Sequence, residues 1–117
     1  MLVAIALGES NHDVVEQRLA GFRRIAASPL LDAELRSAMR REGRTLAEDI
    51  VERVTWVLPD RALTPEIRRV LDAGFLRGAD CLHLASALYL VGEPATLTFL
   101  TLDTRQRAVA RSLGFKT

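Results

Sequence analysis

Three acidic residues, Glu34, Asp80 and Asp103, occupy sequence positions that favour a chemical role. Glu34 follows Leu31 by three residues and precedes Leu35, on the apolar stripe of a predicted helix, so we expect its side chain to point inward. An unpaired carboxylate is costly to bury, and a bound cation would compensate its charge. The pattern fits equally well a glutamate at the boundary of an amphipathic helix.

The two aspartates stand where predicted elements begin or end. Asp80 follows Gly78 and Ala79 at the start of a long apolar helix, where an Asp also commonly serves as an N-cap. Asp103 directly follows a β-rich run and precedes a helix, at the carboxyl end of a parallel strand, where α/β folds build their sites. Its alternative role is helix capping together with Gln106, and the two roles are compatible.

Carboxylates gathered in one place repel one another unless protons or a cation intervene, and oxygen-only sites favour Mg²⁺, with Mn²⁺ as the alternative. Such an ion orients a water, lowers the pKa of that water and stabilises charge during in-line attack on a phosphodiester. The sequence contains no Gly-rich phosphate loop, no serine nucleophile elbow and no Cys/His ligand set. We interpret His83, one turn after Asp80, as a hydrogen-bonded helix histidine in preference to a ligand.

The elements that must position these residues alternate between strands and helices. Strands are predicted at 25–27, 55–58 and 97–102, the last with few charges, as is typical of a parallel strand covered on both faces. Helices are predicted at 2–7, 12–22 after an Asn11 cap, 29–42 after Ser28 and before Gly43, 44–53, from 65 after a Thr64 cap, 80–91 and 104–113. This alternation predicts an α/β domain with a mostly parallel sheet.

The composition predicts one folded domain over residues 1–117, with 49% apolar and 26% charged residues. A formal net charge of +1 gives the whole chain no strong attraction to nucleic acid or to an acidic membrane surface. The single cysteine, Cys81, excludes an internal disulfide and a multi-cysteine zinc site, and it favours a reducing, cytoplasmic location. The apolar opening run is too short for a signal peptide or a membrane span.

Any binding of nucleic acid would therefore depend on local groups of arginines near the acidic residues. These are Arg36, Arg40, Arg41 and Arg44 around the Glu34 helix, and Arg105, Arg107 and Arg111 on the last helix. For any single arginine, an ordinary solvated helix face is the better interpretation. Trp56 and Tyr89 are interpreted as core or dimer residues in preference to platforms for base stacking.

Three segments resemble the PIN domains, most closely the toxin ribonucleases of bacterial VapBC-type toxin–antitoxin pairs: SPLLDAELRSAMRREG, GADCLHLASAL and LTFLTLDTRQRAVARSLGF. The resemblance implies a three-layer α/β/α fold with a mostly parallel sheet. It implies that Glu34, Asp80 and Asp103 correspond to three acidic catalytic residues that bind Mg²⁺ or Mn²⁺. It also implies an endoribonuclease that acts on RNA, a homodimer, and a cognate antitoxin whose tail covers the site.

The sequence departs from this family at its beginning. The family opens with a hydrophobic strand that ends in an Asp, followed by a helix similar to LVAIALGES, so we expect the first strand and its Asp to be absent. A start codon assigned too late, a truncated chain and a degraded relative each explain this expectation.

Two functions from different classes follow. The first is a metal-dependent endoribonuclease, and the second is a catalytically impaired PIN-like module that acts through dimer or antitoxin binding. A phosphatase-like or receiver-like domain ranks below both, because the sequence has neither the nucleophilic DxD pattern nor a Lys near the last strand.

Overall fold

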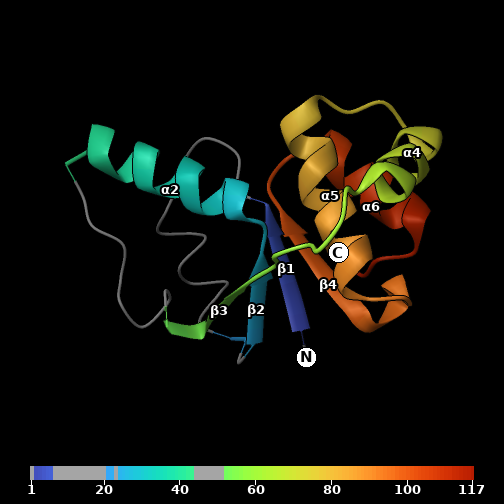
Figure 1. The fold of residues 1–117 in the computed structure, drawn as a ribbon, viewed down its shortest axis with the longest axis horizontal. Helices are drawn as coiled ribbons and strands as arrows, with labels where there is room; N and C mark the ends of the chain where they lie inside the picture. Colours follow the sequence, from blue (N-terminus) through green and yellow to red (C-terminus); the bar gives the residue numbers. More distant parts are fainter. Residues whose placement is uncertain (1, 7–20, 23, 44–51) are drawn as a thin grey trace.

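A single parallel sheet organises the chain in the computed structural model, which describes residues 2–6, 21–22, 24–43 and 52–117. The strands lie in the order β3-β2-β1-β4, and neighbouring strands are parallel (Figure 1). Their bounds are Leu2–Ala6 for β1, Arg24–Ala27 for β2, Val54–Trp56 for β3 and Leu97–Thr101 for β4. The strands predicted at 25–27, 55–58 and 97–102 are confirmed to within two residues at each end.

The first strand corrects two of our expectations. Residues 2–6 form β1, which pairs with β2 from Leu2 to Ala4 and with β4 along its whole length. The predicted helix at 2–7 is therefore wrong, and so is the expected absence of a first strand. A five-residue apolar run has no period that separates a helix from a strand buried on both faces. Pairing with both neighbours satisfies backbone groups that would otherwise be left without partners between β2 and β4.

The described α-helices around the sheet are α2 (Pro29–Arg41), α4 (Thr64–Ala73), α5 (Gly78–Leu90) and α6 (Thr104–Leu113), and a short 3-10 helix, η1 (Pro94–Thr96), precedes β4. The prediction for 104–113 is confirmed residue for residue, and those for 29–42 and 80–91 are confirmed to within two residues. The prediction that Thr64 caps α4 is wrong, because the N-cap position belongs to Leu63 and no side chain caps it. The helices predicted at 12–22 and 44–53 fall mostly outside the described residues. No helix in the described ranges is long and apolar enough to cross a membrane.

Helices cover both faces of the sheet, which gives the expected three-layer arrangement. On one face, Leu97 and Phe99 of β4 pack with Leu84 of α5 in a core to which α4 and α6 also contribute. On the other face, Ile25 of β2 packs with Leu31 of α2, and Leu100 of β4 packs against them. Adjacent residues of a strand point to opposite faces, so the positions of Phe99 and Leu100 place α5 and α2 on opposite sides.

Trp56 and Tyr89, the residues considered above for base stacking, pack against these cores. Trp56 is half-buried against the cluster that contains Ile25 and Leu31, and Tyr89 packs against the cluster around Leu84. This packing supports their interpretation as core residues, and a role in a dimer stays a prediction.

The last described residues extend the sheet beyond β4. The backbone N–H of Phe99 donates to the carbonyl oxygen of Lys116 at 2.7 Å, and the N–H of Lys116 donates to that of Leu97 at 3.1 Å. Gly114 makes this turn possible, because it ends α6 with a φ of 101°, a left-handed conformation that costs glycine little. Strand β4 thereby pairs with β1 on one edge and makes a single bridge, between Thr98 and Lys116, on the other.

Candidate active site

The three acidic residues all stand at the carboxyl edge of the sheet. Strand β2 ends at Ala27 immediately before α2, which carries Glu34, and β4 ends at Thr101 immediately before Asp103. Because the strands are parallel, both of these ends lie at the same edge, where α/β folds place their ligands. The first turn of α5, which carries Asp80, is bound to that edge through Gln106.

Asp103 caps helix α6, as predicted. Its Oδ1 accepts a hydrogen bond of 2.7 Å from the backbone N–H of Gln106, and its own backbone N–H donates to the Thr101 hydroxyl oxygen at 3.1 Å. The Gln106 side chain does not complete the expected capping box by returning to Asp103. Asp103 itself is exposed, and its second carboxylate oxygen has no protein partner within the described residues.

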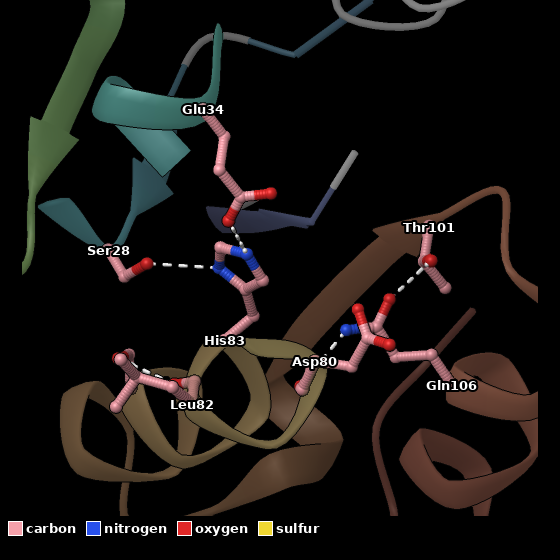
Figure 2. A network of polar contacts seen from close by, with 8 residues as sticks. Ser28, Glu34, Asp80, Leu82, His83, Thr101 and Gln106 are labelled. Carbon is pink, nitrogen blue, oxygen red and sulfur yellow. Dashed lines mark hydrogen bonds and ion pairs between the residues drawn. The ribbon is translucent and has the colours of Figure 1, made fainter. Parts of the chain in front are cut away.

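The buried Gln106 side chain joins β4 to α5. Its Oε1 accepts from the Thr101 hydroxyl at 2.6 Å, and its Nε2 donates to the backbone carbonyl of Asp80 at 3.1 Å (Figure 2). Gln106 is 1% exposed and Thr101 is 2% exposed, so both side chains depend on these bonds to satisfy their polar atoms. The segments that carry Asp80 and Asp103 are therefore held together by one glutamine.

Asp80 is not the N-cap of α5. The N-cap position belongs to Arg77, and Asp80 is the third helical residue, half-buried in the first turn. Its carboxylate makes no hydrogen bond or ion pair with any described residue. The alternative interpretation of Asp80 as an N-cap is therefore wrong.

Glu34 is more exposed than predicted. Its side chain is 41% exposed, whereas Leu31, one turn earlier, is 2% exposed, so Glu34 lies at the border of the apolar stripe and not within it. Its Oε1 lies 3.0 Å from Nε2 of His83, a buried residue of α5. The other ring nitrogen of His83, Nδ1, lies 2.9 Å from the hydroxyl oxygen of Ser28. The interpretation of His83 as a hydrogen-bonded helix histidine is confirmed.

One turn of α5 connects the polar contacts of His83 with those of the Asp80 backbone (Figure 2). Asp80 and His83 are three residues apart, which places both on one face of the helix, so Glu34 approaches the same face of α5 that presents Asp80. Within the described part of the chain, however, no three His, Cys, Asp or Glu side chains are grouped closely enough to hold a metal ion. The assignment of Glu34, Asp80 and Asp103 as metal ligands stays a prediction.

The chemistry of the donor set fits a hard divalent cation. No arginine or lysine of the described ranges pairs with Glu34, Asp80 or Asp103, and each carboxylate retains at least one oxygen without a protein partner there. Carboxylates in a protein are ordinarily paired or hydrogen-bonded, and oxygen donors of this kind are the ligands that Mg²⁺ and Mn²⁺ prefer.

Some of the arginines considered for nucleic-acid contacts already have a protein partner, and others, called open here, have none among the described residues. Arg36 pairs with Asp32 at 2.6 Å, and the half-buried Arg107 donates to the carbonyl of Thr101 at 3.0 Å. Arg111 donates to the Thr117 hydroxyl at 2.7 Å. Arg40, Arg41 and Arg105 are exposed and have no partner among the described residues, whereas Arg44 lies outside them.

Sequence reasoning missed the roles of three polar residues. The sequence predicts Ser28 as the cap of α2, but its hydroxyl contacts His83. Thr101 is predicted only as part of a strand and Gln106 only as a capping partner, but their side chains bind each other, and Gln106 also binds the Asp80 carbonyl. A threonine within an apolar strand and a glutamine on the apolar side of a helix were the available signals, because a buried polar side chain requires a partner.

In a comparison with known protein families, a model of the PIN domain matches residues 1–112. No curated protein and no solved structure matches the chain. PIN domains are generally nucleases that need divalent metal ions and bind nucleic acid. The matched span includes every described strand and nearly all of α6, and the parallel α/β/α arrangement agrees with this family. The chain therefore belongs to the PIN domain family.

Proposed function

We propose that this chain is a divalent-metal-dependent endoribonuclease, formed as one PIN-like domain over residues 1–117. The observation that best supports the proposal is the carboxyl edge of the sheet, where Glu34, Asp80 and Asp103 stand without an Arg or Lys partner among the described residues. A site for a divalent cation and a phosphate needs this surplus of negative charge, which an ordinary surface would neutralise or disperse.

The proposed ligands are carboxylate oxygens of Asp80, Asp103 and Glu34, with Mg²⁺ as the ion and Mn²⁺ as the alternative. A cation held there would lower the pKa of a water and offset charge that develops on the phosphate during in-line attack. The chain's own contribution is to hold its acidic groups in place before substrate arrives. Gln106 fixes the Asp80 and Asp103 segments, and His83 holds Glu34.

The open arginines are proposed to contact the phosphates of RNA. Arg105 lies in the first turn of α6, two residues after Asp103, and Arg40 and Arg41 lie in the last turn of α2. Their guanidinium groups are exposed, so they can reach a phosphate without first breaking an ion pair with a described residue. We expect their removal to weaken RNA binding and to reduce its dependence on salt concentration.

Cleavage of labelled RNA in the presence of Mg²⁺ or Mn²⁺ tests the enzyme. Asp80→Asn and Asp103→Asn should each abolish metal-dependent cleavage while the protein stays folded. Asp72→Asn, which changes an exposed aspartate on α4, should leave cleavage unchanged and serves as the matched control. Equal activity of wild type and Asp80→Asn would eliminate the proposed site.

We further propose that the chain is the toxin of a toxin–antitoxin pair, acts as a homodimer, and is inhibited by a cognate antitoxin whose tail covers the carboxyl edge. The toxin role predicts that expression of the active chain stops growth of a bacterial host and that Asp80→Asn restores it. Growth arrest that persists in this variant at equal expression would contradict the nuclease as its cause. Light scattering of the purified protein measures the oligomeric state.

A specific feature also favours the second candidate, a catalytically impaired PIN-like module. Strand β1, Leu2–Ala6, lies at the centre of the sheet and carries no carboxylate, whereas the family resemblance implies an Asp at the end of the first strand. Calorimetric titration with Mn²⁺ separates the two candidates. Absence of Mn²⁺ binding together with retained dimer formation or antitoxin binding would favour the impaired module.

A further inference from the structure

The histidine of α5 is held at both of its ring nitrogens. Nδ1 of His83 lies 2.9 Å from Oγ of Ser28, and Nε2 lies 3.0 Å from Oε1 of Glu34 (Figure 2). His83 is 4% exposed and Ser28 is 3% exposed, so neither side chain exchanges its partner freely with water. The imidazole therefore has one orientation, set from both sides.

The chemistry of these partners fixes the position of the proton on the neutral ring. A carboxylate only accepts hydrogen bonds, so the contact with Glu34 requires the proton on Nε2. Nδ1 is then an acceptor, and the Ser28 hydroxyl donates to it. The Glu34 carboxylate thus selects the tautomer, and the Ser28 hydroxyl, which can donate or accept, is compatible with it and holds the other side of the ring.

Both partners of His83 come from the opposite side of the sheet. Ser28 immediately precedes α2 and Glu34 lies on α2, whereas His83 belongs to α5, which packs on the other face. The His83 side chain therefore fixes a carboxylate on one layer to a buried point on the other. Without this contact, Glu34 would have no partner among the described residues and would move as an ordinary exposed side chain.

We propose that His83 is a positioning residue that aims Glu34 at a divalent cation, an inference that rests on the proposed function. An imidazole suits this task, because its Nε2–H orients a carboxylate through one hydrogen bond and leaves the second oxygen open, whereas an Arg or Lys would compete with the cation. Only Oε1 of Glu34 is engaged, so Oε2 is available, and the half-exposed side chain is accessible from solvent. Asp80, on the same face of α5 as His83, supplies the next carboxylate.

A purely structural role for His83, namely joining α5 to α2, is the alternative. Two substitutions separate the roles because each preserves a different half of the imidazole. In His83→Gln, the longer side chain carries its amide N–H₂ close to the former Nε2 and can still donate to Glu34. In His83→Asn, the shorter side chain reaches only the region of Nδ1, near Ser28.

The test measures Mn²⁺ affinity by calorimetry and stability by urea unfolding for wild type and both variants. We expect His83→Asn to lower Mn²⁺ affinity by about 10-fold to 100-fold, the usual effect of losing a hydrogen bond to a metal ligand, and His83→Gln to restore most of it. Both variants lose the native ring packing. If His83 had only a structural role, the two variants would therefore be destabilised by similar amounts and would bind Mn²⁺ with similar affinity. Equal affinity of folded His83→Asn and wild type would overturn the inference and leave the proposed function standing.

A milder substitution keeps the inference testable if the His83 variants do not fold. Ser28→Ala removes only the hydrogen bond at Nδ1 that helps to orient the ring, and we expect several-fold weaker Mn²⁺ binding. Ser86→Ala is the matched control, because Ser86 is equally buried on α5 but its hydroxyl donates to the carbonyl of Leu82 at 2.8 Å. Equal Mn²⁺ affinities of the two serine variants would overturn the inference, and a wild-type chain that binds no Mn²⁺ would overturn the proposed function together with it.

Discussion

Gln106 in α6 is bound to Asp80 in α5 by a hydrogen bond of 3.1 Å from its Nε2 to the Asp80 carbonyl oxygen. The backbone N–H of the same Gln106 donates to Oδ1 of Asp103 at 2.7 Å. One residue therefore sets the separation between the two aspartates through both its backbone and its side chain. The positions of the two aspartates depend on a residue that needs no contact with substrate or metal.

Gln106→Leu should destabilise the protein by about 1–3 kcal/mol, because it leaves the Asp80 carbonyl and the Thr101 hydroxyl without their partner in a buried place. Urea unfolding of wild type and variant measures the change in the free energy of unfolding. Arg105→Leu, an exposed neighbour on the same turn, is the control and should stay within about 0.5 kcal/mol of wild type. A Gln106→Leu protein as stable as this control would show that the buried bonds contribute little.

Asp103 combines a capping role with a proposed metal-binding role, and two substitutions separate them. Asp103→Asn retains a side-chain oxygen that can accept from the Gln106 N–H, so its stability should stay within about 0.5 kcal/mol of wild type. Asp103→Ala removes the cap and should cost about 1 kcal/mol.

Metal-dependent cleavage should be lost in both Asp103 variants, because neither carries the carboxylate charge. Parallel measurement of unfolding and RNA cleavage checks the separation. Cleavage that tracks stability, with Asp103→Asn nearly as active as wild type, would leave Asp103 with its capping role alone.

Local patterns predicted most of the elements, because their signals lie within a few residues. Pro29 marked the start of α2, Gly43 with a φ of 68° marked its end and Asp103 marked the start of α6, each as expected. The side chains of Ser28 and Gln106 make other contacts than the expected caps. Residues 2–6 were assigned wrongly, since a short apolar run becomes a strand only through pairing with β2 and β4, which are distant in sequence.

The positions of the candidate residues along the elements could be predicted from the sequence, whereas the contacts that hold them could not. That Asp103 follows a strand could be read from the sequence, because strand ends are local features. That His83 receives Ser28 and Glu34 could not, since these partners are 55 and 49 residues away and meet only after the layers pack. Gln106 is a similar case, because its bond to Asp80 spans 26 residues.

The ion pair between Arg61 and Glu66 gives the protein a predictable response to acid. Arg61 holds Glu66 with two nitrogens, Nη2 to Oε1 at 2.6 Å and Nη1 to Oε2 at 3.0 Å. The hydrogen bond from Arg61 lowers the pKa of the Glu66 carboxyl below its ordinary value of 4.5. Unfolded chains therefore bind a proton at Glu66 at a higher pH than folded chains do.

The contribution of Glu66 to stability is fully present above its unfolded pKa and disappears as pH falls through its lower folded pKa. Glu66→Gln cannot ionise, so the difference in free energy of unfolding between wild type and this variant should be constant from about pH 8 to pH 6 and should shrink between about pH 5 and pH 3. Chemical unfolding at each pH measures it, with Glu93→Gln, an exposed glutamate, as the control. A difference between wild type and Glu66→Gln that stays constant down to pH 3 would mean that the Arg61 pair does not favour the charged form of Glu66 in the folded protein.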